Sequence, residues 1–190
     1  MPEMKPVHRE NWDWNTDAKM GKRERRILSS IYIEPAAEEK MNLRLLNRWK
    51  TIQANEVRYK EYFLDDAEIV IVGFGTAGRV ALSAVREARA EGIKVGLLRP
   101  ITVSPFPYEV IDQLAGRAEA FLVTEMNSGQ MLEDVRLAVK GRVPVEFYGR
   151  LGGVVPFPDE ILNEIHRIAK VKLSADVHPR DAWLERMAHV

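Results

Sequence analysis

The stretch that decides the fold is EIVIVGFGTAGRVALSAVREARAEGIKVGLLR, which runs from Glu68 to Arg99. Its first residues, Glu68 to Val72, form an apolar run that is typical of a parallel strand covered on both faces. A glycine-rich turn follows, then a helical pattern from Thr76 to Glu91 and a second apolar run from Lys94 to Leu98. The order strand, helix, strand indicates a unit of parallel sheet.

The rest of the chain repeats this alternation. Further strands are predicted at residues 120–124 and 144–147, and further helices at residues 107–115, 130–139 and 158–169, with a short helix after Pro179. Gly92, Gly116 and Gly141 each follow a predicted helix, where a left-handed C-cap residue is expected. The pattern predicts an α/β fold, a three-layer, doubly wound and mainly parallel sheet.

The first third of the chain has a different texture. Residues 1–21 are polar and irregular, and they carry Trp12 and Trp14. This segment is expected to be an extended arm whose two indoles pack either on the chain's own domain or on a partner, because exposed aromatic rings of this size are costly in water.

A long helix is expected from Pro35 to about Phe63. Leu45, Trp49 and Ile52 recur at helical spacing and predict one buried face, while the charged opposite face is either solvated or a subunit contact. We therefore predict an arm and linker helix over residues 1–65, an α/β domain over residues 66–172 and a tail over residues 173–190.

Composition excludes several classes of protein. Lys plus Arg and Asp plus Glu both number 28, so no net charge favours nucleic acid or an anionic membrane. No apolar run is long enough to span a bilayer, and residues 1–10 do not resemble a signal peptide, so the cytoplasm is expected. With no cysteine, the chain cannot supply thiolates to a zinc or iron-sulfur site.

The glycine motif GFGTAGR contains Gly73, Gly75 and Gly78 between a strand and a helix, the setting in which a dinucleotide pyrophosphate binds. However, the next strand ends in Arg99 and a proline rather than in the carboxylate that bonds a ribose. The favoured interpretation is a tight turn that lets the helix approach the sheet. A bound anion or partner group at this loop is the second alternative, and a nicotinamide nucleotide, with Arg99 on its 2′-phosphate, is the third.

A second loop, TEMNSGQ, follows the third strand of the parallel set and carries Glu125, Asn127 and Gln130. The carboxyl ends of parallel strands are where open sheets place functional groups. One carboxylate and two amides form no acid–base pair, and capping of the next helix by Asn127 or Ser128 is favoured over a ligand contact. Arg150 lies in another glycine-rich loop, and it is expected to anchor an ion pair more readily than to bind a substrate.

Neither a catalytic set nor a metal site is predicted. The four histidines have no metal-like spacing and no nucleophile motif accompanies them.

Four segments taken together resemble the alpha subunit of 2-oxoacid:ferredoxin oxidoreductases, with the 2-oxoisovalerate and 2-oxoglutarate types as the nearest likeness. The resemblance runs from about Lys22 to Ile168. The segments are KRERRILSSIYIEP (22–35), NEVRYKEYFLDDAEIVIVGFGTAGRVALSAVREARAEGIKVGLLRPITVSPFP (55–107), FLVTEMNSGQMLEDVRLAV (121–139) and VEFYGRLGGVVPFPDEI (145–161).

This resemblance implies a fold like the C-terminal domain of transketolase and a role in subunit assembly. The complete complex would oxidatively decarboxylate a 2-oxoacid to an acyl-coenzyme A and reduce ferredoxin, using thiamine diphosphate, magnesium and iron-sulfur clusters. None of these cofactors is expected on this chain alone. Its implied partners are a thiamine-binding beta subunit, gamma and ferredoxin-like subunits, and further copies of the chain.

Overall fold

The computed structural model of the chain describes residues 29–171, 173 and 177–188. The predicted arm with Trp12 and Trp14 lies outside the described residues. The chain divides into two units, residues 1–45 and 46–190, and each is described by itself. Helix α1 (Pro35–Asn55) begins in the first unit and ends in the second.

The second unit is built on one five-stranded sheet in the order β1-β3-β2-β4-β5. The strands are β1 (Tyr59–Tyr62), β2 (Ile69–Gly73), β3 (Val95–Pro100), β4 (Ala120–Glu125) and β5 (Val145–Gly149). All neighbours are parallel except β1, which pairs antiparallel with β3. In the central register, Ile71 of β2 lies between Leu97 of β3 and Leu122 of β4.

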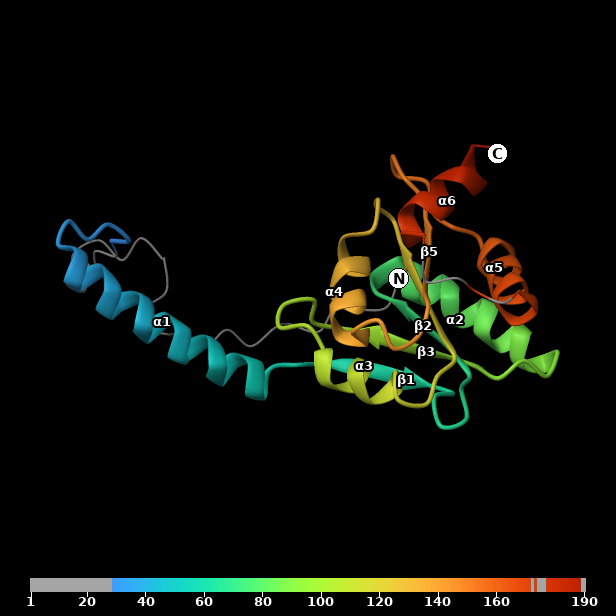
Figure 1. Cartoon of the computed structure of the whole chain (residues 1–190), viewed down its shortest axis with the longest axis horizontal. Helices are drawn as coiled ribbons and strands as arrows, with labels where there is room; N and C mark the ends of the chain where they lie inside the picture. Colours follow the sequence, from blue (N-terminus) through green and yellow to red (C-terminus); the bar gives the residue numbers. More distant parts are fainter. Residues whose placement is uncertain (1–28, 172, 174–176, 189–190) are drawn as a thin grey trace, which may run out of the picture. The chain divides into compact units, whose positions relative to one another are not determined.

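Two helical layers cover the sheet. Figure 1 shows α3 and α4 on one face and α2 and α5 on the other, with α6 beside β5. The helices are α2 (Gly75–Ala90), α3 (Tyr108–Leu114), α4 (Gln130–Val139), α5 (Pro158–Lys170) and α6 (Pro179–Met187). The predicted three-layer, mainly parallel α/β fold is confirmed, and so are the four parallel strands and the five helices predicted after residue 66.

The core lies between these layers. Every residue of β2 and β4 is buried, which explains why residues 69–72 and 120–123 are apolar without alternation. The helices instead bury one stripe each, as α2 does with Ala77, Ala81, Ala84 and Ala88. These small side chains let the helix axis lie close to the sheet.

The prediction that the long helix reaches Phe63 is wrong for residues 56–63. The helix ends at Asn55, and residues 59–62 form the edge strand β1. The physical reason is that Tyr59 to Tyr62 gain ladder hydrogen bonds along β3, and the preceding Arg58 N–H donates to Thr102 Oγ1 at 2.9 Å. Aromatic residues also favour strands over helices.

The predicted buried face of α1 is also wrong. None of the residues of α1 is buried, and Leu45 and Trp49 are 47% and 38% exposed. Tyr59 and Phe63 are exposed as well. Periodicity marks an apolar face correctly, but the described part of this chain supplies nothing that buries it.

Two of the three predicted glycine caps are confirmed. Gly92 and Gly141 have φ angles of 88° and 70°, in the left-handed region. The prediction for Gly116 is wrong, because its φ angle is not in the left-handed region. Instead, its N–H donates to Gln113 O at 3.1 Å and that of Ala118 donates to Leu114 O at 2.9 Å, so the chain leaves α3 through further right-handed turns.

Candidate functional site

All the predicted site residues lie at the carboxyl end of the sheet. Gly73 ends β2, Arg99 is near the end of β3, Glu125 ends β4 and Arg150 directly follows β5. The Arg150 N–H donates to Glu125 O at 3.2 Å, which joins the last two of these positions. This edge is where open parallel sheets place their functional groups.

The glycine loop at this edge is shaped by close packing. A Cβ atom on Gly78 would lie 2.3 Å from Gly73 O, and one on Gly73 would lie 2.8 Å from Thr124 Cγ2. Gly75 differs, because it is exposed, has nothing within 4 Å of its Cβ position and adopts a φ of +55°. The geometry agrees with the favoured interpretation, a tight turn that brings α2 onto the sheet.

Arg99 is adjacent to this turn. Its Cγ lies 3.2 Å from the Cβ position of Gly78, so the side chain packs along the start of α2. Its Nε is buried and has no hydrogen-bond partner among the residues that the structure describes. The nucleotide interpretation requires a carboxylate at the end of β3 that bonds the ribose. That strand ends instead in Arg99 and Pro100, so the requirement is not met.

The loop after β4 is organised by two side chains. Glu125 is 1% exposed, and its two carboxylate oxygens accept the N–H groups of Met131 and Leu132, each at 3.0 Å. Asn127 Nδ2 donates to the same carboxylate at 3.1 Å, and Asn127 Oδ1 accepts the N–H of Gly129 at 2.7 Å and of Gln130 at 3.0 Å. Both residues therefore cap the start of α4.

The predicted capping role of Asn127 is confirmed. The role of Glu125 was missed, because its backbone partners lie six and seven residues further along the chain, beyond the reach of a local capping pattern. Gln130, the third candidate of this loop, is exposed and begins α4.

Burial raises the pKa of the Glu125 carboxyl above its ordinary value, although the hydrogen bonds from Met131, Asn127 and Leu132 oppose the shift. Raised carboxyl pKa values are common at functional sites, but they also arise wherever a structural carboxylate is buried. Here every contact of the carboxylate serves the fold of the loop, so Glu125 is a structural cap.

Arg150 forms an ion pair with Glu160 at the start of α5. The nitrogen and oxygen atoms are 3.3 Å apart, and both side chains are largely buried. This pair confirms the prediction that Arg150 acts as an anchor, since it fixes the loop after β5 against a helix.

Helix α6 adds residues that sequence reasoning missed. Arg180 Nε donates to Ser128 O at 2.6 Å, and its NH2 group donates to Gly129 O at 3.0 Å and to Glu133 at 2.9 Å. The side chain thus binds two carbonyl groups of the loop before α4. No local sequence signal marks Arg180 for this contact, because the partners are about fifty positions away.

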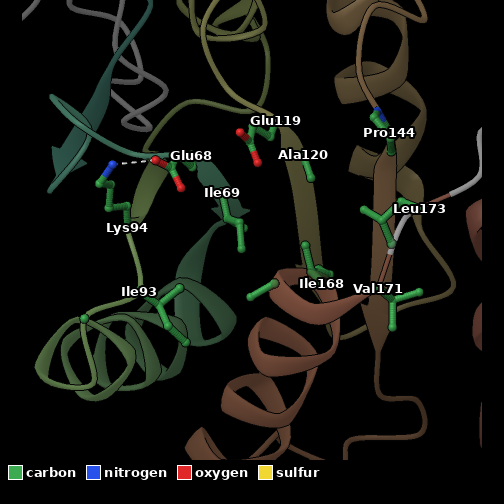
Figure 2. A pocket seen from close by; sticks show the side chains of 12 residues that line it. Glu68, Ile69, Ile93, Lys94, Glu119, Ala120, Pro144, Ile168, Val171 and Leu173 are labelled. Carbon is green, nitrogen blue, oxygen red and sulfur yellow. Dashed lines mark hydrogen bonds and ion pairs between the residues drawn. The ribbon is translucent and has the colours of Figure 1, made fainter.

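A pocket lies at the opposite, amino-terminal end of the parallel strands. It measures about 490 Å³, with Ile69, Ile93 and Ile168 among its lining side chains (Figure 2). Lys94 Nζ is 2.6 Å from Glu68 Oε1 across its rim, and this contact raises the pKa of Lys94. Glu68, one of the two carboxylates that line this pocket, is therefore paired rather than free for acid–base chemistry.

Within residues 29–171, 173 and 177–188, no three His, Asp or Glu side chains are grouped as a metal ion would require. No helix of the described chain meets the length and hydropathy of a membrane span.

Comparison with solved structures defines the class of fold. A chain of 2-oxoglutarate:ferredoxin oxidoreductase from Magnetococcus marinus superposes with a TM-score of 0.63 at 23% identity, over 72% of this chain and 24% of that one. A split-gene transketolase superposes with a TM-score of 0.52 at 18% identity, over 61% and 42%. The fold is that of a transketolase C-terminal-like α/β domain.

The sequence then identifies the family. Residues 67–161 match the model of pyruvate:ferredoxin oxidoreductase core domain II, and the chain belongs to this family. It is 45% identical to ketoisovalerate oxidoreductase subunit VorB of Methanothermobacter thermautotrophicus, over 88% of this chain and 47% of the relative. It is 35% identical to 2-oxoglutarate synthase subunit KorA of Methanothermobacter marburgensis, over 69% and 35%. The chain thus spans about half the length of VorB, the longer of these matches.

Proposed function

We propose that the chain is the C-terminal, assembly-forming part of the alpha subunit of a 2-oxoacid:ferredoxin oxidoreductase. The observation that carries this proposal is the match to core domain II, together with 45% identity to a ketoisovalerate oxidoreductase subunit. The complex would convert a 2-oxoacid and coenzyme A into an acyl-coenzyme A and carbon dioxide and pass two electrons to ferredoxin. Substrates of the 2-oxoisovalerate or 2-oxoglutarate type agree with the two relatives.

In this proposal the chain positions other polypeptides rather than reacting itself. Thiamine diphosphate, magnesium and the iron-sulfur clusters would be held by the beta, gamma and ferredoxin-like subunits. This division agrees with the absence of cysteine from the sequence and with loops at the carboxyl end whose polar groups are used in capping. We place the complex in the cytoplasm.

The surfaces for assembly come from the elements that the fold leaves uncovered. Against the part of the chain that the structure describes, helix α1 has no buried residue, and the loop after β5 exposes Leu151, Val154 and Phe157 by 49%, 46% and 62%. Apolar surface of this kind marks sites of protein contact. We assign residues 1–65 to an arm and linker helix, residues 66–172 to the α/β domain and residues 173–190 to a tail, with contacts to other subunits and to further copies of the chain.

The experiment that tests the proposal is affinity recovery of the tagged chain from its native host. We expect thiamine-binding and cysteine-rich subunits to co-purify in fixed ratio, with the absorbance of iron-sulfur clusters and with ferredoxin reduction that depends on a 2-oxoacid and coenzyme A. Recovery of the chain alone, or of partners without this activity, would contradict it.

A further inference from the structure

The two edges of the sheet differ in how they are covered. At β5, Arg186 donates a hydrogen bond to Phe147 O at 3.0 Å, and Trp183 packs edge-on against the Phe147 ring with centroids 5.1 Å apart. Helix α6 therefore closes this edge. Strand β1 forms the other edge of the described sheet, and Tyr59, Lys60 and Glu61 are all exposed. An exposed edge presents backbone groups that can pair with another strand.

The direction of the β1 backbone groups follows from its register. Ile101 N donates to Arg58 O at 2.9 Å, and Lys60 lies opposite Arg99. In an antiparallel pair, hydrogen-bonded positions alternate along the strand, so Arg58, Lys60 and Tyr62 direct their backbone groups toward β3. Tyr59 and Glu61 consequently direct theirs away from the sheet. Pro100, which has no N–H, lies opposite Tyr59, in agreement with this assignment.

A pocket of about 540 Å³ lies beside this edge. Tyr59 lines it together with apolar residues, among them Val57, Phe106 and Val110, and with the polar residues Gln53, Glu109 and Gln113. Because side chains alternate along a strand, Tyr59 and Glu61 lie on the pocket's side of the sheet and Lys60 lies on the other. A strand added to β1 would therefore place one set of side chains toward the pocket and the other toward Lys60.

A second copy of β1 is a poor occupant of this edge. Pairing through the outward positions allows three antiparallel registers, in which Tyr59 or Glu61 of one copy lies opposite Tyr59 or Glu61 of the other. If Tyr59 of one copy lies opposite Tyr59 of the other, Lys60 lies opposite Arg58. If Tyr59 lies opposite Glu61, the two Lys60 side chains face each other. If Glu61 lies opposite Glu61, two carboxylates face each other. Parallel pairing in register is not available, because residue i of a parallel strand bonds to residues j−1 and j+1 of its partner, and two copies would set the same outward groups against each other. Like charges directly opposite each other destabilise a strand pair.

We propose that β1 binds an extended segment of a different polypeptide, which adds a sixth strand to the sheet. Its backbone pairs with Tyr59 and Glu61, an apolar side chain enters the pocket beside Tyr59, and a carboxylate faces Lys60. Main-chain hydrogen bonds give such strand addition its affinity, and the alternating side chains give it specificity. The inference is independent of the proposed function, since it depends only on the edge, its charges and the pocket.

The test uses the full chain, labelled with ¹⁵N, and an acetylated and amidated eight-residue peptide that alternates valine with glutamate. We expect the peptide to slow hydrogen exchange at the Tyr59 and Glu61 amides at least tenfold and to leave the Lys60 amide unchanged. A peptide with lysine in place of glutamate should bind at least fivefold more weakly at low salt, because its charges face Lys60.

A matched pair of variants separates strand addition from general binding. Glu61→Pro removes one outward N–H and leaves the pairing with β3 in place, whereas Glu61→Ser removes the same carboxylate and keeps the N–H. The serine variant should bind the valine–glutamate peptide, and the proline variant should lose binding while the exchange of the β3 amides stays slow.

Three results would overturn the inference. One is the absence of protection at millimolar peptide, and another is equal binding by the proline and serine variants. The third is slow exchange of the Tyr59 and Glu61 amides before any peptide is added. Sedimentation then tells which cover is present: a monomer means that the chain covers its own edge, and a dimer means that a second copy covers it.

Discussion

The carboxylate of Glu125 replaces a local capping residue at the start of α4. It reaches across the loop to two backbone N–H groups, and Asn127 binds it from the side. Because the carboxylate is buried, ionisation is less favourable in the folded chain than in the unfolded chain, and its pKa is raised. The loop at the carboxyl end of β4 is therefore sensitive to the charge of one side chain.

A Glu125→Gln variant measures this sensitivity. The unfolded carboxyl, with an ordinary pKa of 4.5, ionises before the folded one. The advantage of wild type over the variant in free energy of unfolding should thus be largest below that pH and fall as pH rises through the raised folded pKa. Urea denaturation of both proteins across this range checks the sign, because their other titrating groups are shared. A difference that grows with pH would contradict the assigned shift.

The glycine loop gives a second prediction. Gly78→Ala should destabilise the fold by about 3 kcal/mol or more, since the new Cβ would lie 2.3 Å from a backbone oxygen. Gly75→Ala is the matched control. Its methyl group meets open space and only the left-handed φ opposes it, which costs about 1 kcal/mol.

Thermal unfolding of both glycine variants compares the two costs. Equal effects would show that α2 does not depend on close approach at Gly78. Calorimetric titration of the wild type with NAD⁺ and NADP⁺ tests the nucleotide alternative, and we expect no saturable binding.

Single residues were predictable where their partners are near in sequence. Residue type and position next to a helix are enough to predict that Asn127 is a cap, and its acceptor oxygen binds N–H groups two and three residues away. Arg150 was assigned to an ion pair from its loop position, and Glu160 is its partner. Glu125 and Arg180 were beyond such reasoning, since their partners are set by how β4, α4 and α6 meet in space.

Among the elements, α6 depends on few contacts. Pro179 and Trp183 are its buried residues, and Arg180 and Arg186 bind backbone carbonyl groups on the loop before α4 and on β5. A short helix of this composition is not stable alone. Its place beside β5 therefore rests mainly on two buried side chains and two guanidinium groups.

Trp183→Ala should lower the free energy of unfolding by about 3 kcal/mol, because it empties a buried site against Phe147. Leu184→Ala, one position further along the same helix and 51% exposed, should change it by less than about 1 kcal/mol. Urea denaturation followed by tryptophan and far-ultraviolet signals distinguishes the two. Similar costs for both variants would mean that α6 is not held by the indole.

The elements of the parallel sheet were predictable because burial on both faces leaves uninterrupted apolar runs. Strand β1 was not, since Tyr59 and Phe63 continue the helical spacing of Trp49 and Ile52 and so concealed the change of period. An exposed edge strand is short and charged, and these are also the properties of a solvated helix face. Only the pairing with β3 decides between them.

For the whole molecule, the uncovered surface of α1 supports the proposed assembly role. Leu46 is 58% exposed on this helix, and Leu137 on α4 is 67% exposed. If α1 is an interface, Leu46→Asp should reduce recovery of partner subunits at least tenfold, whereas Leu137→Asp, with an equal change of charge, should not. Quantitative mass spectrometry of the recovered complexes provides the measurement. Equal recovery with both variants would remove α1 from the interface.

Helix α1, with none of its residues buried, also bears on how cells balance the supply of subunits. Among the described residues nothing buries this helix fully, and a helix with little support from burial opens readily to proteases. A copy of the chain that has not met its partners would be cleaved there first, while an assembled copy would survive. Turnover would in this way remove surplus chains and hold the subunits near their working ratio without any dedicated signal.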